Sequence, residues 1–227
     1  MKKLFPFITC LMISGFYAQN LKSFTVPKGY KKVTEIKGDL DKDGKDETVL
    51  VFDTDKTASD YERAPGKKDY KRILYILKNE QGTLKIWKKN SHILNSSGIG
   101  FYPDDNILDI QIKKNCLILL QNFFSNSRHT QTNQYTFRFQ NGDFYLIGLY
   151  DNFADTCDFD FTNEINFSTG KVIIERTYSS CDDDNKKVPE NIYKEFIHQL
   201  KTLIKMNDFR IGEHRFKIPG LQEDFVF

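Results

Sequence analysis

The sequence predicts a mainly β protein, in which an antiparallel meander or sandwich-like sheet is followed by one C-terminal amphipathic helix. Its composition favours strands, because 20 Phe and 11 Tyr residues accompany a single Trp among 227 residues. Turn signals rich in Gly, Asn and Asp recur at the short intervals that are typical of an all-β chain. Near the C-terminus the apolar residues change to a helical period.

The first 18 residues have the pattern of a secretory signal peptide. Lys2 and Lys3 precede an apolar run at residues 4–16, and Ala18 follows it. The run is too short to span a bilayer comfortably. Cleavage is expected after Ala18, with the next residue as the alternative. We expect residues 19–227 to form a single β-rich domain without a further membrane-spanning segment.

Ten strands are expected along the chain. They span residues 30–37, 48–53, 73–78, 84–88, 107–112, 116–122, 134–140, 144–150, 159–167 and 171–179. The turns at residues 79–82, 113–115 and 141–143 are short, so neighbouring strands should pair antiparallel. Residues 54–71 are polar and contain a Pro-Gly pair, which predicts a long surface loop.

The C-terminal helix is expected at residues 189–206. Its apolar side chains fall on one arc at a 3.6-residue period: Ile192, Tyr193, Phe196, Ile197, Leu200, Leu203 and Ile204. Lys194, Lys201 and Lys205 fall on the opposite face, and Pro189 suits a first helical turn. The helix is expected to pack on the sheet, and a membrane-surface helix is the alternative.

Cys157 and Cys181 are predicted to form a disulfide bond. If Phe167 faces Lys171 across the last hairpin turn, the register places the two cysteines opposite each other. Facing strand residues have β-carbons within reach of a disulfide, and such bonds persist in exported proteins. Cys116 alternates with apolar residues and is expected to be a buried free thiol.

The segment "KGDLDKDGKDETVLVF" concentrates negative charge beside an apolar strand. Five carboxylates lie within nine residues, and four of them are candidate ligands of a metal ion: Asp39, Asp41, Asp43 and Glu47. Carboxylates this close repel one another unless a cation neutralises them, and calcium takes six to eight oxygen ligands in flexible geometry. Gly44 permits the bend that turns alternate side chains toward one centre. The sequence therefore predicts a calcium site that includes the backbone carbonyl of Lys45, and a solvated acidic turn without metal is the alternative.

The residues from Gly38 to Glu47, followed by an apolar strand, resemble the "GDxDxDGxxD" loop of FG-GAP/VCBS repeat proteins. Glu47 stands where an Asp is commoner in that signature. The resemblance implies an exported bacterial protein, because many exported proteins of this type carry one such loop near the mature N-terminus. In the family these loops bind calcium and support β-propeller blades, often in adhesion or ligand-binding proteins. A full propeller needs several repeats, and this chain has one such loop, so a complete propeller is not expected.

Three further groups are expected to be structural. The acidic run at residues 181–185 is interpreted as a solvated loop, with a second ion site as the alternative. Phe123, Phe124 and Tyr102 are expected in the core, with an exposed aromatic patch as the alternative. The Arg128-His129 pair is assigned to the surface, with ligand binding as the alternative.

The charge balance argues against a nucleic-acid partner. After loss of the two N-terminal lysines, 31 basic residues face 31 acidic residues. We therefore expect a non-enzymatic, calcium-stabilised binding or structural module of the bacterial cell envelope, located in the periplasm or outside the cell. Its partner would be an unknown protein or glycan. The alternative is a secreted hydrolase that uses paired carboxylates as acid and base.

Overall fold

The computed structural model describes residues 24–58, 68–181 and 187–227. The predicted signal peptide and most of the acidic run at residues 181–185 lie outside the described residues, as does the middle of the loop predicted at residues 54–71. Within these ranges the chain is mainly β, and each of the ten expected strands is present. No helix in the described ranges combines the length and apolar character needed to cross a bilayer.

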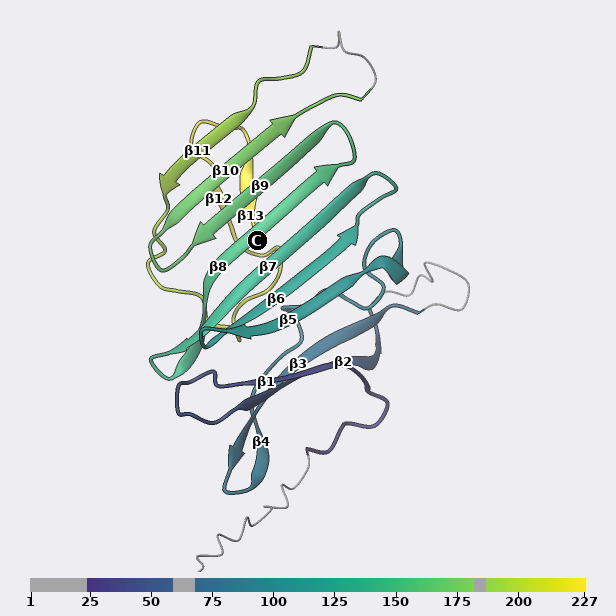
Figure 1. Cartoon of the computed structure of the whole chain (residues 1–227), viewed down its shortest axis with the longest axis vertical. Helices are drawn as coiled ribbons and strands as arrows, with labels where there is room; N and C mark the ends of the chain where they lie inside the picture. Colours follow the sequence, from purple (N-terminus) through teal and green to yellow (C-terminus); the bar gives the residue numbers. More distant parts are fainter. Residues whose placement is uncertain (1–23, 59–67, 182–186) are drawn as a thin grey trace, which may run out of the picture.

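The strands form two large antiparallel sheets and one small one (Figure 1). The first sheet has the order β1-β2-β3-β4, with β1 at Lys31–Gly38, β2 at Glu47–Thr57, β3 at Tyr70–Glu80 and β4 at Thr83–Asn90. The second is a seven-stranded meander of β5 (Ile107–Lys113), β6 (Cys116–Phe124), β7 (His129–Gln140), β8 (Asp143–Asp155), β9 (Phe159–Asn166), β10 (Lys171–Tyr178) and β11 (Ile192–Ile197). The small sheet pairs β12 (Arg215–Lys217) with β13 (Asp224–Val226). A short 3-10 turn, Pro103–Asp105, precedes β5.

Two-residue turns explain the meander. Three hairpins have turns in which both residues adopt the left-handed backbone conformation: Gln81-Gly82, Lys114-Asn115 and Asn141-Gly142. Turns of this kind match the right-handed twist of the flanking strands, so each one forces the next strand to pair antiparallel with the last. The short turns recognised in the sequence therefore account for the pairing of β3 with β4, β5 with β6 and β7 with β8.

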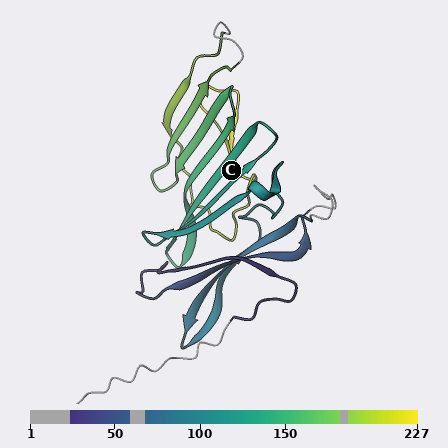
Figure 2. The ribbon, with the colours of Figure 1, turned by 45° about the vertical axis from the view of Figure 1, so that its right-hand side comes forward.

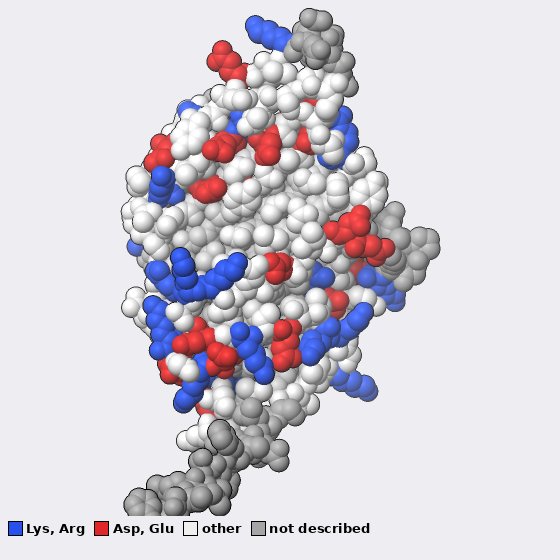
Figure 3. Space-filling model, in the orientation of Figure 1, with Lys and Arg blue, Asp and Glu red and all other residues white. Residues whose placement is uncertain are grey.

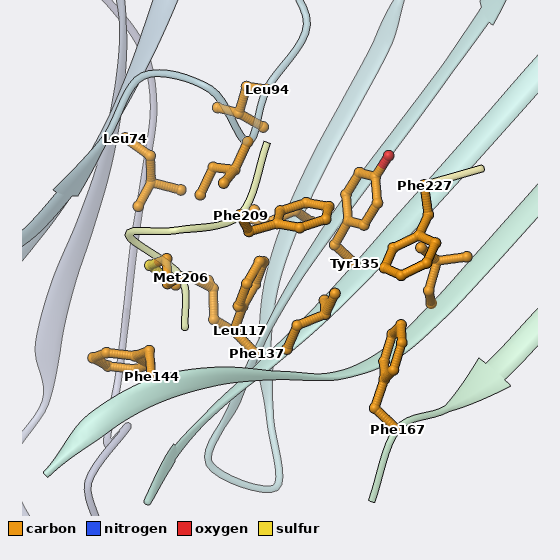
Figure 4. Packing of buried hydrophobic residues seen from close by; sticks show 14 of the residues in the cluster. Leu74, Leu94, Leu117, Tyr135, Phe137, Phe144, Phe167, Met206, Phe209 and Phe227 are labelled. Atoms are coloured by element: carbon orange, nitrogen blue, oxygen red, sulfur yellow. The ribbon is translucent and has the colours of Figure 1, made fainter. Parts of the chain in front are cut away.

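A shared hydrophobic core joins the two large sheets. Leu74 of β3, Leu117 of β6, Phe137 of β7 and Phe209 of the C-terminal segment belong to one buried cluster (Figure 4). The four-stranded sheet lies at one end of the molecule next to β5, and the yellow C-terminal segment lies behind the seven-stranded sheet (Figures 1 and 2). No described element covers the opposite face of that sheet (Figure 1).

The predicted helix at residues 189–206 is wrong, because its first part is the edge strand β11. β11 pairs with β10 in regular register. Phe196 is partly buried against the core, whereas Tyr193 and Ile197 are 60% and 66% exposed. The apolar residues assigned to one helical face therefore lie on both faces of a strand, and tertiary pairing overrides the local pattern.

The second part of that segment is also not helical. It crosses the start of β8, where the Leu146 N–H donates to the Ile204 carbonyl over 2.9 Å and the Met206 N–H donates to the Phe144 carbonyl over 2.9 Å. Its apolar side chains still pack on the sheet, as expected for the helix. The prediction was therefore right about burial and wrong about backbone conformation.

The predicted Cys157–Cys181 disulfide is confirmed, with a Cα–Cα distance of 5.6 Å. The register argument behind it is off by one residue, because Lys171 pairs with Asn166. The hairpin closes with a four-residue turn, in which the Gly170 N–H donates to the Asn166 carbonyl over 2.7 Å. Both cysteines lie beyond the last strand pair, where the chain is free to absorb the offset.

Cys116 is a free thiol but is half-buried rather than buried. On β6 the core face carries Leu117 and Leu119, whereas Cys116 and Ile118 lie on the other face. Both faces of this strand are apolar, so the alternation of side chains along the sequence did not identify which face is buried in the core.

Candidate metal centre

The acidic loop (residues 39–47) connects β1 to β2 and lies where the two sheets meet. Leu40 is 1% exposed and anchors the loop in the shared core. The side-chain amide of Asn115, in the β5–β6 turn, donates to the Asp39 carbonyl over 2.7 Å. A Cβ atom on Gly38 would lie 2.9 Å from a side-chain carbon of Ile112 in β5, so this close approach requires glycine. The loop therefore contacts both sheets.

Main-chain amides organise the loop around its carboxylates. Asp39 accepts from the Lys42 N–H over 2.6 Å and from the Gly44 N–H over 3.1 Å, one bond at each oxygen. Asp43 Oδ1 accepts from the Lys45 N–H over 2.9 Å. Lys42 and Gly44 adopt the left-handed conformation, with φ of 67° and 80°, which tightens the bend.

Glu47 is the buried member of the set, at 1% exposure. Its Oε2 accepts from the Leu40 N–H over 2.8 Å, which closes the loop across its base. Burial raises the pKa of Glu47 above its ordinary value, because the charged form loses water contacts. A cation beside this carboxylate would favour its ionised form.

Lys78 of β3 supplies such a cation. Its ammonium contacts Asp41 Oδ2, lies 3.0 Å from Asp43 Oδ2 and lies 3.8 Å from Glu47 Oε1. The hydrogen bond from Lys78 lowers the pKa of Asp43. Burial alone would lower the pKa of Lys78, but hydrogen bonds to the Asp41 and Asp43 carboxylates outweigh it and raise that pKa. The ammonium also lies 4.9 Å from the centre of the Trp87 ring.

The donor set is of the kind that calcium binds. One carboxylate oxygen from each of Asp39, Asp41 and Asp43 lies within 4.8 Å of the others, and contact with Lys78 brings in Glu47. Four carboxylates and one ammonium leave a net charge of −3 (−4 + 1) around this centre. Hard oxygen ligands with surplus negative charge suit a divalent cation. Lys45 is exposed, and its predicted carbonyl ligation stays a prediction.

Lys78 is the residue that sequence reasoning missed. Thr48 pairs with Leu77 across β2 and β3, so Lys78 stands beside the start of β2, where Glu47 begins the strand. The sequence did contain a clue to this contact, because the strand expected at residues 73–78 ends in a lysine. Recognising it required the register between two strands that a long loop separates.

A second charged group surrounds Asp155, whose side chain is 2% exposed. It accepts from Arg128 over 2.7 Å and from the Cys157 and Asp158 main-chain N–H groups over 2.8 and 2.9 Å, and its Oδ2 lies 2.9 Å from His129 Nε2. Burial alone would raise the pKa of Asp155, but these hydrogen bonds lower it to about 2. Arg128 and His129 therefore have a structural task next to the disulfide.

Asp151 lies on the inner face of the seven-stranded sheet. Its hydrogen-bond partners are the side-chain amides of Gln131, Asn133 and Asn163, at 2.5, 2.7 and 3.0 Å, rather than a second carboxylate. Burial raises the pKa of Asp151. This arrangement differs from the facing acid and base that a hydrolase would need.

The open face of the seven-stranded sheet is broad and largely uncharged at its centre (Figure 3). It contains a shallow hollow of about 630 Å³, lined by residues that include Thr136, Gly148, Tyr150 and Ile173, with Glu164 as the carboxylate among them. A second hollow of about 630 Å³ lies on the first sheet. Each is large enough for a small ligand.

The aromatic residues named in the sequence are divided between the core and the surface. Phe123 is buried, whereas Phe101 and Tyr102 are 56% and 41% exposed. Tyr102 contacts Phe124 edge to face, with the ring centres 5.5 Å apart. Phe101, Tyr102 and Phe124 therefore form a small surface aromatic group next to β6.

Comparisons with protein-family models, with curated proteins and with solved structures found no match for this chain.

Proposed function

We propose that this protein is an exported, non-enzymatic β-rich module whose first hairpin is stabilised by a calcium ion. One observation carries the proposal: Asp41, Asp43 and Glu47 each direct one carboxylate oxygen toward a single cation position. The loop around that position is already held in shape by main-chain hydrogen bonds. A preorganised set of oxygens lowers the conformational cost of binding an ion.

The ion would serve structure rather than catalysis. Each of the carboxylates of Asp39, Asp43 and Glu47 also accepts a main-chain N–H of the loop, so none is free to move with a substrate. Because Asn115 ties the loop to the second sheet, an ion bound there would also stabilise the junction between the sheets. Metal binding and folding would then be coupled.

The disulfide supports export, because such bonds persist in the periplasm and outside the cell. The open face of the seven-stranded sheet, with its hollow around Gly148, is a surface on which a protein or glycan partner could bind. Phe101 and Tyr102 offer a second, aromatic contact surface. We assign the module to the bacterial cell envelope on these grounds and on the loop resemblance.

The alternative, a secreted hydrolase with paired carboxylates, has one supporting observation. Asp53 and Asp55 both line the hollow on the first sheet. However, Arg72 binds Asp53 over 3.1 Å, which occupies one member of the pair. Hydrolysis of a glycoside substrate by the protein, abolished in Asp55→Asn, would establish this alternative.

A calorimetric titration tests the leading proposal. Protein stripped with EDTA is titrated with calcium and, separately, with magnesium. We expect saturable binding of about one calcium ion per chain and weaker binding of magnesium, which demands stricter octahedral geometry. Absence of heat with millimolar calcium would refute the calcium site.

A further inference from the structure

We propose that Lys78 is the resident cation of the acidic loop, and that a divalent ion enters by displacing the Lys78 ammonium group. This inference rests on the proposed function, because it concerns the same centre. It adds that the site is filled from within when metal is absent, and that metal and lysine exclude each other. The affinity for metal is therefore set in part by a residue of β3 outside the acidic loop.

The atoms in contact with Lys78 are the ones that a metal would need. Asp41 accepts the Asp43 N–H at Oδ1 and contacts Lys78 through Oδ2. Asp43 and Glu47 make the same two kinds of contact. In each carboxylate one oxygen accepts a main-chain N–H and the other oxygen faces the Lys78 ammonium. Because the second oxygen of each carboxylate faces one position, that position cannot hold an ammonium and a divalent ion together.

Lys78 is suited to leave without disturbing the fold. Its side chain is 22% exposed, so a route to water exists. Four flexible methylene groups carry the charge, whereas the loop carboxylates are restrained by main-chain hydrogen bonds. An ammonium neutralises one of four negative charges and a calcium ion neutralises two, so the exchange relieves more of the repulsion.

Trp87 of β4 reports the exchange. The Lys78 ammonium lies 4.9 Å from the centre of its ring, within cation–π range. Trp87 is held by Phe139 and Phe144, with ring centres 4.7 and 4.9 Å away, so it stays in place when Lys78 moves. It is the single Trp in the sequence, so intrinsic fluorescence reads this position alone.

The test compares wild type with Lys78→Met, each treated with EDTA and titrated with calcium by calorimetry and by Trp fluorescence. Removing the competing charge should raise calcium affinity roughly tenfold or more, which corresponds to about 1.4 kcal/mol. Fluorescence should change with calcium in wild type and stay constant in Lys78→Met. In EDTA the variant should melt at a lower temperature than wild type, and calcium should restore it.

Two further variants act as controls. Lys78→Arg keeps the charge and should show no gain in calcium affinity. If Lys78→Met folds poorly, the change in wild-type Trp fluorescence with calcium still tests the inference, and no change would overturn it. Lys89→Met removes an exposed lysine of the neighbouring strand β4 and should leave both readouts unchanged.

The outcomes separate this inference from the proposed function. Equal calcium affinity in wild type and Lys78→Met, with unchanged wild-type fluorescence, would overturn the role of Lys78 and leave the calcium site standing. Absence of calcium binding in both proteins would overturn the two proposals together.

Discussion

The acidic loop and the disulfide loop (residues 155–158, at the β8–β9 connection) are both organised by an aspartate that accepts main-chain N–H groups. Asp39 in the first and Asp155 in the second each accept two main-chain N–H groups from residues that follow them. In both loops a side chain from a neighbouring segment brings positive charge to the aspartates, Lys78 in one and Arg128 in the other.

The two loops differ in how their charge is balanced. Asp155 accepts a hydrogen bond from Arg128 and lies beside His129, and the Cys157–Cys181 disulfide joins this loop covalently to the chain after β10. The acidic loop instead sets four carboxylates against the ammonium of Lys78. Residues of the chain therefore balance the negative charge of the disulfide loop. The acidic loop keeps surplus negative charge that an external cation can neutralise.

The largest effect is expected from removing the disulfide. In a variant with both Cys157→Ala and Cys181→Ala, the free energy of unfolding should fall by about 3 kcal/mol, because the bond closes a loop with a sequence separation of 24. Urea denaturation measures this. The rise in stability with calcium should survive in the variant, and its loss would contradict the independence of the two loops.

The next effect concerns the acidic loop. At a calcium concentration 100 times the dissociation constant, binding should stabilise wild type by about 2.7 kcal/mol. Asp41→Asn should lose most of this gain, because Asp41 directs an oxygen to the cation position. Asp46→Asn is the matched control, since Asp46 is exposed and lies in the same loop outside the carboxylate cluster. Equal losses in both variants would mean that only the overall charge of the loop matters.

A third prediction uses pH. The pKa of Asp155 is about 2 in the folded protein, below the ordinary value of 3.8. A lowered folded pKa means that ionised Asp155 stabilises the fold above about pH 4, and that this contribution is lost as the pH falls from about 4 to about 2. Asp155→Asn should lack this part of the pH profile in urea denaturation. Superimposable profiles for the two proteins would contradict the assigned role.

The smallest effect is expected at the link between the sheets. Asn115→Gly removes the hydrogen bond to the Asp39 carbonyl but tolerates the left-handed backbone, since Asn115 has a φ of 58°. The expected loss is about 1 kcal/mol, measured by urea denaturation. No loss would indicate that the Asn115 hydrogen bond contributes nothing measurable to holding the acidic loop against the second sheet.

Much of the fold was predictable, because alternation and tight turns act locally. The three two-residue turns and the apolar alternation around them predicted the antiparallel pairing of the strands that they join. The helix predicted at residues 189–206 was wrong, because the apolar residues of Ile192–Ile197 suit one face of a helix and also the two faces of an edge strand. Only pairing with β10, which is a tertiary event, decides between the two.

The convergence of the four carboxylates was predictable from the sequence, whereas their contact with Lys78 was not. Asp39, Asp41, Asp43 and Glu47 lie in one short segment, so their convergence follows from local chain geometry. Lys78 reaches them only through the pairing of β2 with β3 across a long loop, which composition and spacing do not specify. The disulfide was predicted correctly despite a register error, because residues beyond the strand ends have freedom to adjust.

The most direct test is a crystal structure of the protein grown in millimolar calcium, with anomalous scattering used to locate the ion. We predict a calcium peak between Asp41, Asp43 and Glu47, with the Lys78 side chain turned away toward solvent. Absence of a peak, with the Lys78 ammonium still among these carboxylates, would contradict the account.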